Sequence, residues 1–97
     1  ILNEIKLDMD SYSTFINDKK IDLTRTEFLL LEALIKNQGR VLSRDQLVKR
    51  KRIWGDDKII YDRTIDVHVK NLREKLASSG KIIKTVRGIG YIIDTND

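Results

Sequence analysis

The stretch "DRTIDVHVKNLREKL" (Asp62–Leu76) decides the fold that this sequence predicts. Its apolar residues recur at i, i+4, i+7 and i+11, which is one narrow stripe along an amphipathic helix: Ile65, Val69, Leu72 and Leu76. Asp62 can cap the start of such a helix, and we predict it over residues 63–78. The opposite face either meets solvent or lies against a partner, and it carries charged, amide and aliphatic side chains: Arg63, Val67, Lys70, Asn71 and Glu74.

Two further helical patterns precede this helix. In "LTRTEFLLLEALIKNQG", Thr24 is followed three residues later by Glu27, which is the signature of a capping box, and Gly39 is typical of a helix end. Ser43 and Gln46 repeat the capping pattern before Leu47. The sequence therefore predicts helices over 24–39 and 43–54, followed by a loop over 55–62.

Short strands are predicted at both ends of the chain. Residues 1–23 contain "IKLDMD" (Ile5–Asp10), which alternates apolar and polar residues, then "YSTFI" (Tyr12–Ile16), a turn cluster at Asn17–Lys20, and "IDL" (Ile21–Leu23). Residues 81–94, "KIIKTVRGIGYIID", predict a hairpin with a basic, glycine-containing tip. The predicted fold class is therefore α+β, with an antiparallel N-terminal platform, three helices and a C-terminal hairpin.

The composition and charge of the chain limit the kinds of partner that it can bind. Its 97 residues suit one domain, and the net charge of +4 divides unevenly between −1 over residues 1–40 and +5 over residues 41–97. That asymmetry indicates a polyanionic partner for the C-terminal part.

No apolar run is long enough to cross a membrane, and the chain contains no cysteine, so we expect a cytoplasmic protein. The first residue is Ile1 rather than methionine, which suggests a piece of a longer chain.

Catalytic and metal-binding chemistry find little support. The chain has a single histidine, His68, and helical geometry rotates it away from the face shared by Asp62 and Asp66. "RGIGY" lacks both the third glycine and the following helix of a nucleotide-binding loop. We therefore expect no enzymatic activity, no metal ion and no cofactor.

Nucleic-acid binding is better supported. Within the predicted helix 63–78, Asn71 could pair with adenine, Val67 could contact a thymine methyl group, and the basic residues suit phosphates. From spacing alone, a base-reading face and a solvated face remain equally open. Arg87, at the tip of the hairpin, could enter a narrow minor groove, and this favours the first alternative.

Several blocks of the sequence together resemble a known family. "LTRTEFLLLEALIKNQGRVLSRDQL", "WG", "DRTIDVHVKNLREKL" and "IKTVRGIGYII" are similar to the C-terminal effector domain of OmpR/PhoB-type response regulators. The resemblance implies a winged helix-turn-helix with a four-stranded platform, a recognition helix and a hairpin wing. It also implies a bacterial two-component system: a sensor histidine kinase phosphorylates an absent receiver domain, and a tandem dimer then binds direct-repeat promoter DNA and contacts RNA polymerase.

The resemblance implies roles for individual residues. Base-reading positions are Val67, Asn71 and Arg87. Phosphate-facing positions are Arg44, Trp54, Arg63, His68, Lys70, Arg73, Thr85 and Tyr91. The segment presented to RNA polymerase comprises Gly55, Asp56, Asp57, Lys58, Ile59, Ile60 and Tyr61. Structural alternatives stay open for three of these: His68 as a half-buried side chain, Trp54 as a packing residue and Tyr91 as a core residue. We expect Asp66 to orient neighbouring basic side chains.

Two departures from the family pattern bear on specificity. Asn71 stands where many relatives carry arginine, so we expect a different preferred base, with adenine as the first choice. Lys51-Arg52 repeats Lys49-Arg50 like an insertion, and two extra helical residues would rotate the subsequent part of the helix by about 200°.

Two other functional classes stay open, namely a winged-helix module that binds protein and a nucleic-acid-binding protein without sequence preference.

Overall fold

The computed structural model describes residues 4–50 and 62–94 of the chain. Along the sequence run strands β1 (Ile5–Asp8), β2 (Ser13–Ile16) and β3 (Lys19–Ile21), then helix α1 (Arg25–Lys36), strand β4 (Leu42–Ser43) and helix α2 (Arg44–Val48). Helix α4 (Asp62–Leu76), a 3-10 helix η1 (Ala77–Ile82) and strands β5 (Ile83–Val86) and β6 (Gly90–Ile93) follow. The fold class is α+β, as the sequence predicts.

Strands β1, β2 and β3 form an antiparallel N-terminal sheet in that order. Asn17 and Asp18 both have positive φ, 50° and 67°, as a two-residue type I′ turn requires, and the turn closes directly on the pair Ile16↔Lys19. Strand β3 therefore begins at Lys19, two residues earlier than the predicted segment 21–23. The resemblance implies a four-stranded platform, and this sheet has three strands within the described residues.

Helix α1 begins with the predicted capping box. The Thr24 amide donates to Glu27 Oε1 at 3.0 Å, and the Glu27 amide donates to Thr24 Oγ1 at 3.1 Å. The helix ends at Lys36, three residues before the predicted end at Gly39, which adopts a left-handed φ of 85°. The buried side of α1 supplies much of the core: Phe28, Leu29, Leu30, Leu31 and Leu34.

Helix α2 is shorter than the predicted helix 43–54. Its capping box at Ser43 and Gln46 is present, but the helix ends at Val48 with Lys49 as its C-cap. Only basic residues follow Val48 as far as residue 52, so no apolar side chain extends the buried face there. Before α2, Leu42 and Ser43 form the short strand β4, which pairs with β6 at Tyr91 and Gly90 and was not predicted.

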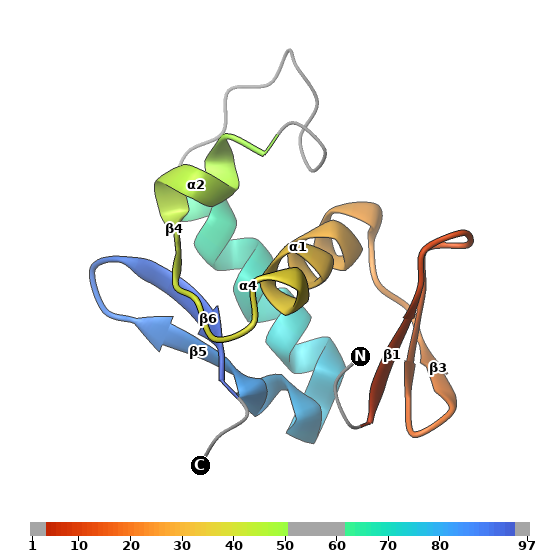
Figure 1. The fold of residues 1–97 in the computed structure, drawn as a ribbon. Helices are drawn as coiled ribbons and strands as arrows, with labels where there is room; N and C mark the ends of the chain where they lie inside the picture. The colour runs from red at the N-terminus through yellow and green to blue at the C-terminus, as the bar shows by residue number, and fades with distance from the viewer. Residues whose placement is uncertain (1–3, 51–61, 95–97) are drawn as a thin grey trace.

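Helices α1 and α4 pack between the two sheets, and α2 lies against α4 and β4. Figure 1 shows α1 and α4 at the centre, the N-terminal sheet on one side and the hairpin β5–β6 on the other. The second sheet has the strand order β4-β6-β5. The helix predicted over 63–78 ends at Leu76, and η1 begins at the next residue. Lys75 of α4 donates to the buried carboxylate of Glu27 at 2.7 Å and so connects the two central helices. Within the described ranges, no helix has the length and apolar character that a membrane span needs.

Candidate nucleic-acid interface

The two faces of α4 differ as its apolar stripe predicts. Ile65, Val69 and Leu72 are fully buried. The opposite face is exposed from Val67 to Glu74, because Val67 retains 52% of its surface and Lys70, Asn71 and Glu74 are also exposed. Among the described residues, none of these outward side chains has a hydrogen bond or ion pair.

One flank of α4 is joined to α2 and to the hairpin by four residues, which we name the arginine–tyrosine cluster: Arg44, Asp66, Arg73 and Tyr91. Asp66 Oδ1 accepts hydrogen bonds from Arg44 Nε at 2.8 Å and from the Tyr91 hydroxyl at 2.5 Å. Both guanidinium carbons lie over the Tyr91 ring, at 5.3 Å for Arg44 and 5.5 Å for Arg73. The cluster therefore places two cations beside the outward face of α4.

Arg73 fixes the hairpin against α4. Its Nε donates to the Ile83 carbonyl at 2.9 Å, and its Nη2 donates to Thr85 Oγ1 at 2.8 Å. Both acceptors belong to β5. The orientation of the hairpin relative to α4 is thus set by hydrogen bonds in addition to apolar packing.

The charges of the cluster stabilise one another. Burial raises the pKa of Asp66, but hydrogen bonds from Tyr91 and Arg44 outweigh it and hold this pKa below its ordinary value. The hydrogen bond to Asp66 raises the pKa of Arg44, and burial together with the same carboxylate raises the pKa of Tyr91. At neutral pH the cluster therefore contains one carboxylate and two guanidinium cations around a neutral phenol.

The tip of the hairpin presents Arg87 to solvent. Gly88 follows it with a φ of 76°, a conformation that favours glycine. The Ile89 amide donates to the Val86 carbonyl at 2.9 Å, and the Ile89 carbonyl accepts from the Arg44 amide at 3.1 Å. The tip is thereby attached to the first residue of α2.

Gly90 is required for a different reason. A Cβ atom at this position would lie 2.0 Å from the Leu42 carbonyl oxygen, because β6 runs directly against β4. The two glycines of "RGIGY" therefore serve a turn and a close backbone approach, respectively.

The structure brings together most of the residues singled out from sequence. Val67, Lys70 and Asn71 share the outward face of α4, Arg44 and Arg73 lie in the cluster beside it, and Thr85 and Arg87 are exposed on the hairpin. His68 is half-buried on the opposite flank of α4 and makes interactions within the protein. Tyr91 is 4% exposed and its hydroxyl donates to Asp66, so its ring is part of the core, and its contact with phosphate stays a prediction.

Some predicted site residues belong to the part of the chain that is not described. Trp54, the predicted polymerase-facing segment 55–61 and the repeated Lys51-Arg52 lie outside the described residues. Arg63 belongs to the first turn of α4, and its side chain is also outside the described part. Sequence reasoning gave no role to Ile89, although its position between two glycines at a turn was a signal of exposure.

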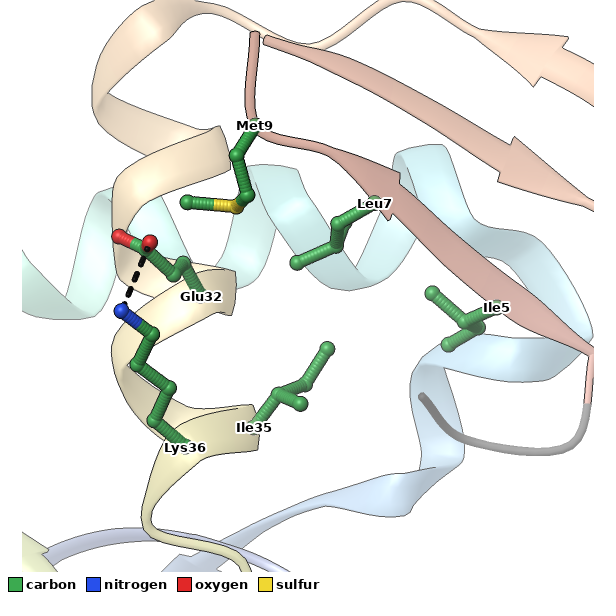
Figure 2. Close-up of a pocket in the computed structure, with 6 residues that line it drawn as sticks. All are labelled: Ile5, Leu7, Met9, Glu32, Ile35 and Lys36. Atoms are coloured by element: carbon green, nitrogen blue, oxygen red, sulfur yellow. Dashed lines mark ion pairs between the residues drawn. The ribbon is translucent and has the colours of Figure 1, made fainter.

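The described cavities lie apart from this interface. A cavity of about 200 Å³ lies between β1 and α1. Figure 2 shows the residues that line it: Ile5, Leu7, Met9, Glu32, Ile35 and Lys36. A second, of about 360 Å³, lies where the N-terminal sheet meets the end of α4. No group of three metal-ligating side chains occurs in the part of the chain that the structure describes.

Known proteins resemble the chain in both sequence and structure. Residues 18–93 match the family model described as "Transcriptional regulatory protein, C terminal". The chain is 42% identical over 94 residues to the response regulator ArlR of Staphylococcus haemolyticus, covering 95% of the chain and 42% of that protein. It is 40% identical over 94 residues to the phosphate regulon regulator PhoB of Rhizobium meliloti, covering 95% of the chain and 40% of that protein. The chain thus spans about two-fifths of the length of these relatives.

Two solved DNA-binding domains share the fold over nearly their whole length. The DNA-binding domain of the response regulator AdeR, solved in complex with an intercistronic region, has a TM-score of 0.83 at 31% identity and covers 99% of this chain and 98% of its own. The DNA-binding domain of CpxR from E. coli has a TM-score of 0.82 at 31% identity, with 100% and 96% covered. The chain therefore belongs to the family of transcriptional regulatory protein C-terminal domains, as a winged helix-turn-helix, DNA-binding domain of the OmpR/PhoB type of response regulator.

Proposed function

We propose that this domain binds duplex DNA sequence-specifically, with α4 in the major groove and the hairpin as a wing on the adjacent minor groove. One observation carries the proposal: the exposed Val67, Lys70 and Asn71 occupy one face of α4, and the arginine–tyrosine cluster fixes the hairpin beside it. A helix of this kind fits the major groove, where each base pair presents a distinct pattern of donors and acceptors.

The proposed contacts divide by chemistry. Asn71 donates to and accepts from an adenine edge, Val67 packs on a thymine methyl group, and Arg87 enters the minor groove. Phosphates are contacted by the residues that are basic or carry hydrogen-bond donors: Arg44, Trp54, Arg63, His68, Lys70, Arg73 and Thr85. The Tyr91 ring packs against the guanidinium groups of Arg44 and Arg73, which both lie over it, and so positions them for these contacts.

We propose that this domain is part of a longer protein, which supplies the regulation. We propose that its receiver domain is phosphorylated by a sensor histidine kinase and that two effector domains then bind a direct repeat in tandem. Residues 55–61 are the proposed contact with RNA polymerase. The support for these steps is the similarity to response regulators in sequence, which extends over 95% of this chain.

Selection of bound duplexes from random DNA, repeated at several salt concentrations, tests the proposal. We expect one enriched half-site, repeated in tandem, and a binding constant that falls steeply with salt because phosphate contacts release counterions. Salt-dependent binding without an enriched sequence would support a non-specific nucleic-acid binder instead. Salt-independent or undetectable binding would support a protein-interaction module.

Two outward residues of α4 separate base reading from phosphate contact. Asn71→Ala should relax the preference at one base position and cost about 1–3 kcal/mol on the preferred site. Lys70→Ala should weaken binding equally on all duplexes and reduce the salt slope by about one. An unchanged preference profile for Asn71→Ala would remove this residue from the base-reading set.

The wing has its own test in Arg87→Ala. We expect the largest loss of affinity on sites with A/T-rich flanks, where the minor groove is narrow and its negative potential is strong. Arg25→Ala is the matched control, because Arg25 is an exposed arginine at the start of α1, where it lies over the Tyr12 ring and not on the hairpin. An equal loss on all flanking sequences would contradict the groove-reading role of Arg87.

A further inference from the structure

Two side chains project from the tip of the hairpin, one cationic and one aliphatic. The tip comprises Arg87, Gly88 and Ile89, followed by Gly90 at the start of β6. Space around Gly88 is open, since a Cβ added there would have nothing within 4 Å. Without side chains on its two glycines the tip is slender, which suits a minor groove only about 6 Å wide.

Ile89 is unusually exposed for an aliphatic side chain. It retains 53% of its surface, and Val67, on the proposed base-reading face, retains 52%; the other exposed large apolar side chains in the described part retain 36–39%. Single exposed apolar residues are common and need no special role. Here, however, the two most exposed both belong to the surface that faces DNA in the proposed function.

The backbone of Ile89 is held on both sides. Its amide donates to the Val86 carbonyl at 2.9 Å, and its carbonyl accepts from the Arg44 amide at 3.1 Å. Arg44 is in turn bound to Asp66 of α4 through its Nε at 2.8 Å. Ile89 is therefore fixed relative to α4, and binding costs little further ordering of this residue.

We propose that Ile89 packs against the deoxyribose wall of the minor groove while Arg87 occupies the groove itself. Minor-groove-binding proteins commonly place apolar side chains, isoleucine included, against base steps in the groove, and the sugars that line the groove offer a similar apolar surface. This inference rests on the proposed function, because it adds an apolar contact to a wing already placed on DNA. It assigns part of the affinity to a residue without charge.

The absence of charge gives the inference a distinctive signature. Ile89→Thr keeps a side chain branched at Cβ but replaces its ethyl group with a hydroxyl group. Burial of the remaining half of an isoleucine side chain corresponds to about a fivefold change in affinity, which is about 1 kcal/mol. We therefore expect Ile89→Thr to bind about fivefold more weakly with an unchanged salt slope, and Ile89→Val to retain most of the affinity. Arg87→Ala, in contrast, should lower the salt slope by about 0.9.

The experiment compares these variants with the unmodified chain on one duplex selected from a random pool, by fluorescence anisotropy at several salt concentrations. Met9→Thr is the matched control, because Met9 is also an exposed apolar residue, 36% exposed. It directly follows β1, which lies across the helices from the hairpin (Figure 1). Thermal unfolding verifies that each variant is folded.

The outcomes separate this inference from the function on which it rests. A loss of affinity for Ile89→Thr with unchanged salt slope, and none for Met9→Thr, supports the contact. If Ile89→Thr binds like the unmodified chain while Arg87→Ala is weakened, the contact is refuted and the DNA-binding wing stands. If the unmodified chain shows no salt-dependent duplex binding, the proposed function and this inference both fall.

Discussion

The two glycines of the hairpin should respond very differently to the same substitution. Gly90→Ala places a Cβ atom 2.0 Å from the Leu42 carbonyl oxygen and 2.7 Å from the Ser43 Cα, whereas ordinary non-bonded contacts lie near ~3.5 Å. Both neighbours are backbone atoms of β4, so no side-chain rotation relieves the clash. Strand β4 must move away from β6 by about 1 Å or more.

The cost of that movement depends on the contacts that β4 makes. The β4–β6 pairing joins Leu42 to Tyr91 and Ser43 to Gly90. Its backbone hydrogen bonds contribute about 1 kcal/mol each, and displacement of the buried Leu42 and Tyr91 adds a packing loss of about 1–3 kcal/mol. We expect Gly90→Ala to lower the free energy of unfolding by about 3 kcal/mol, which is roughly 15 °C in Tm for a domain of this size.

Gly88→Ala is the matched comparison within the same motif. Nothing lies within 4 Å of an added Cβ atom there, so the cost is only the strain of an L-residue at a φ of 76°, about 1 kcal/mol. Gly88→Asn should cost less, since asparagine tolerates this conformation, while Gly90→Asn should be as damaging as Gly90→Ala. Urea denaturation followed by circular dichroism measures all four. A loss for Gly90→Ala no larger than that for Gly88→Ala would refute the close approach of β4 and β6.

Three further changes test other parts of the structure. Burial raises the pKa of Glu27, but hydrogen bonds from Lys75 and Thr24 outweigh this effect. The pKa therefore lies below its ordinary value of about 4.3 in the folded state. The ionised Glu27 side chain thus stabilises the fold above pH ~4.3, and this stabilisation is lost as the pH falls through the folded pKa. Glu27→Gln should therefore cost about 1–3 kcal/mol at pH 7 and progressively less in acid, and a pH-independent difference in urea unfolding would contradict the ion pair. Thr14→Val should raise the unfolding free energy by about 1 kcal/mol, because Thr14 Oγ1 is buried without a hydrogen-bond partner among the described residues, and a destabilised variant would indicate an unseen partner. Arg73→Lys retains the charge but loses the paired hydrogen bonds to the Ile83 carbonyl and Thr85 Oγ1. The affinity for DNA should therefore fall several-fold while the salt slope stays unchanged. Unchanged affinity would mean that binding does not require the hairpin to be fixed by Arg73.

Local signals in the sequence were sufficient to place the helices that form the core. The capping box of Thr24 and Glu27 marks the start of α1 because both hydrogen bonds are made within one turn. The apolar stripe of α4 likewise predicts which of its faces is buried, since helical geometry fixes that relation. Exposure of the face that carries Val67 and Asn71 follows from the same periodicity.

Elements that depend on distant partners could not be predicted in this way. Strand β4 is two residues long, and only its pairing with Tyr91 and Gly90 makes it a strand. The bond between Asp66 and Tyr91 joins residues far apart in sequence, and neither residue alone indicates the other. Helix α4 ends two residues before the predicted end, where η1 begins, which is within the usual uncertainty of a helix boundary. Helix α2 ends six residues early, because its capping pattern marks a start but only basic residues follow Val48 as far as residue 52.

The separation of the two faces of α4 makes the choice of target independent of folding. Ile65, Val69 and Leu72 hold the helix in place, and Asp66 and Arg73 hold its neighbours. Val67, Lys70 and Asn71 support none of this, so they can be exchanged without loss of structural integrity. A domain built in this way can be retargeted by a few outward substitutions, and a library randomised at those three positions should yield folded members almost without exception.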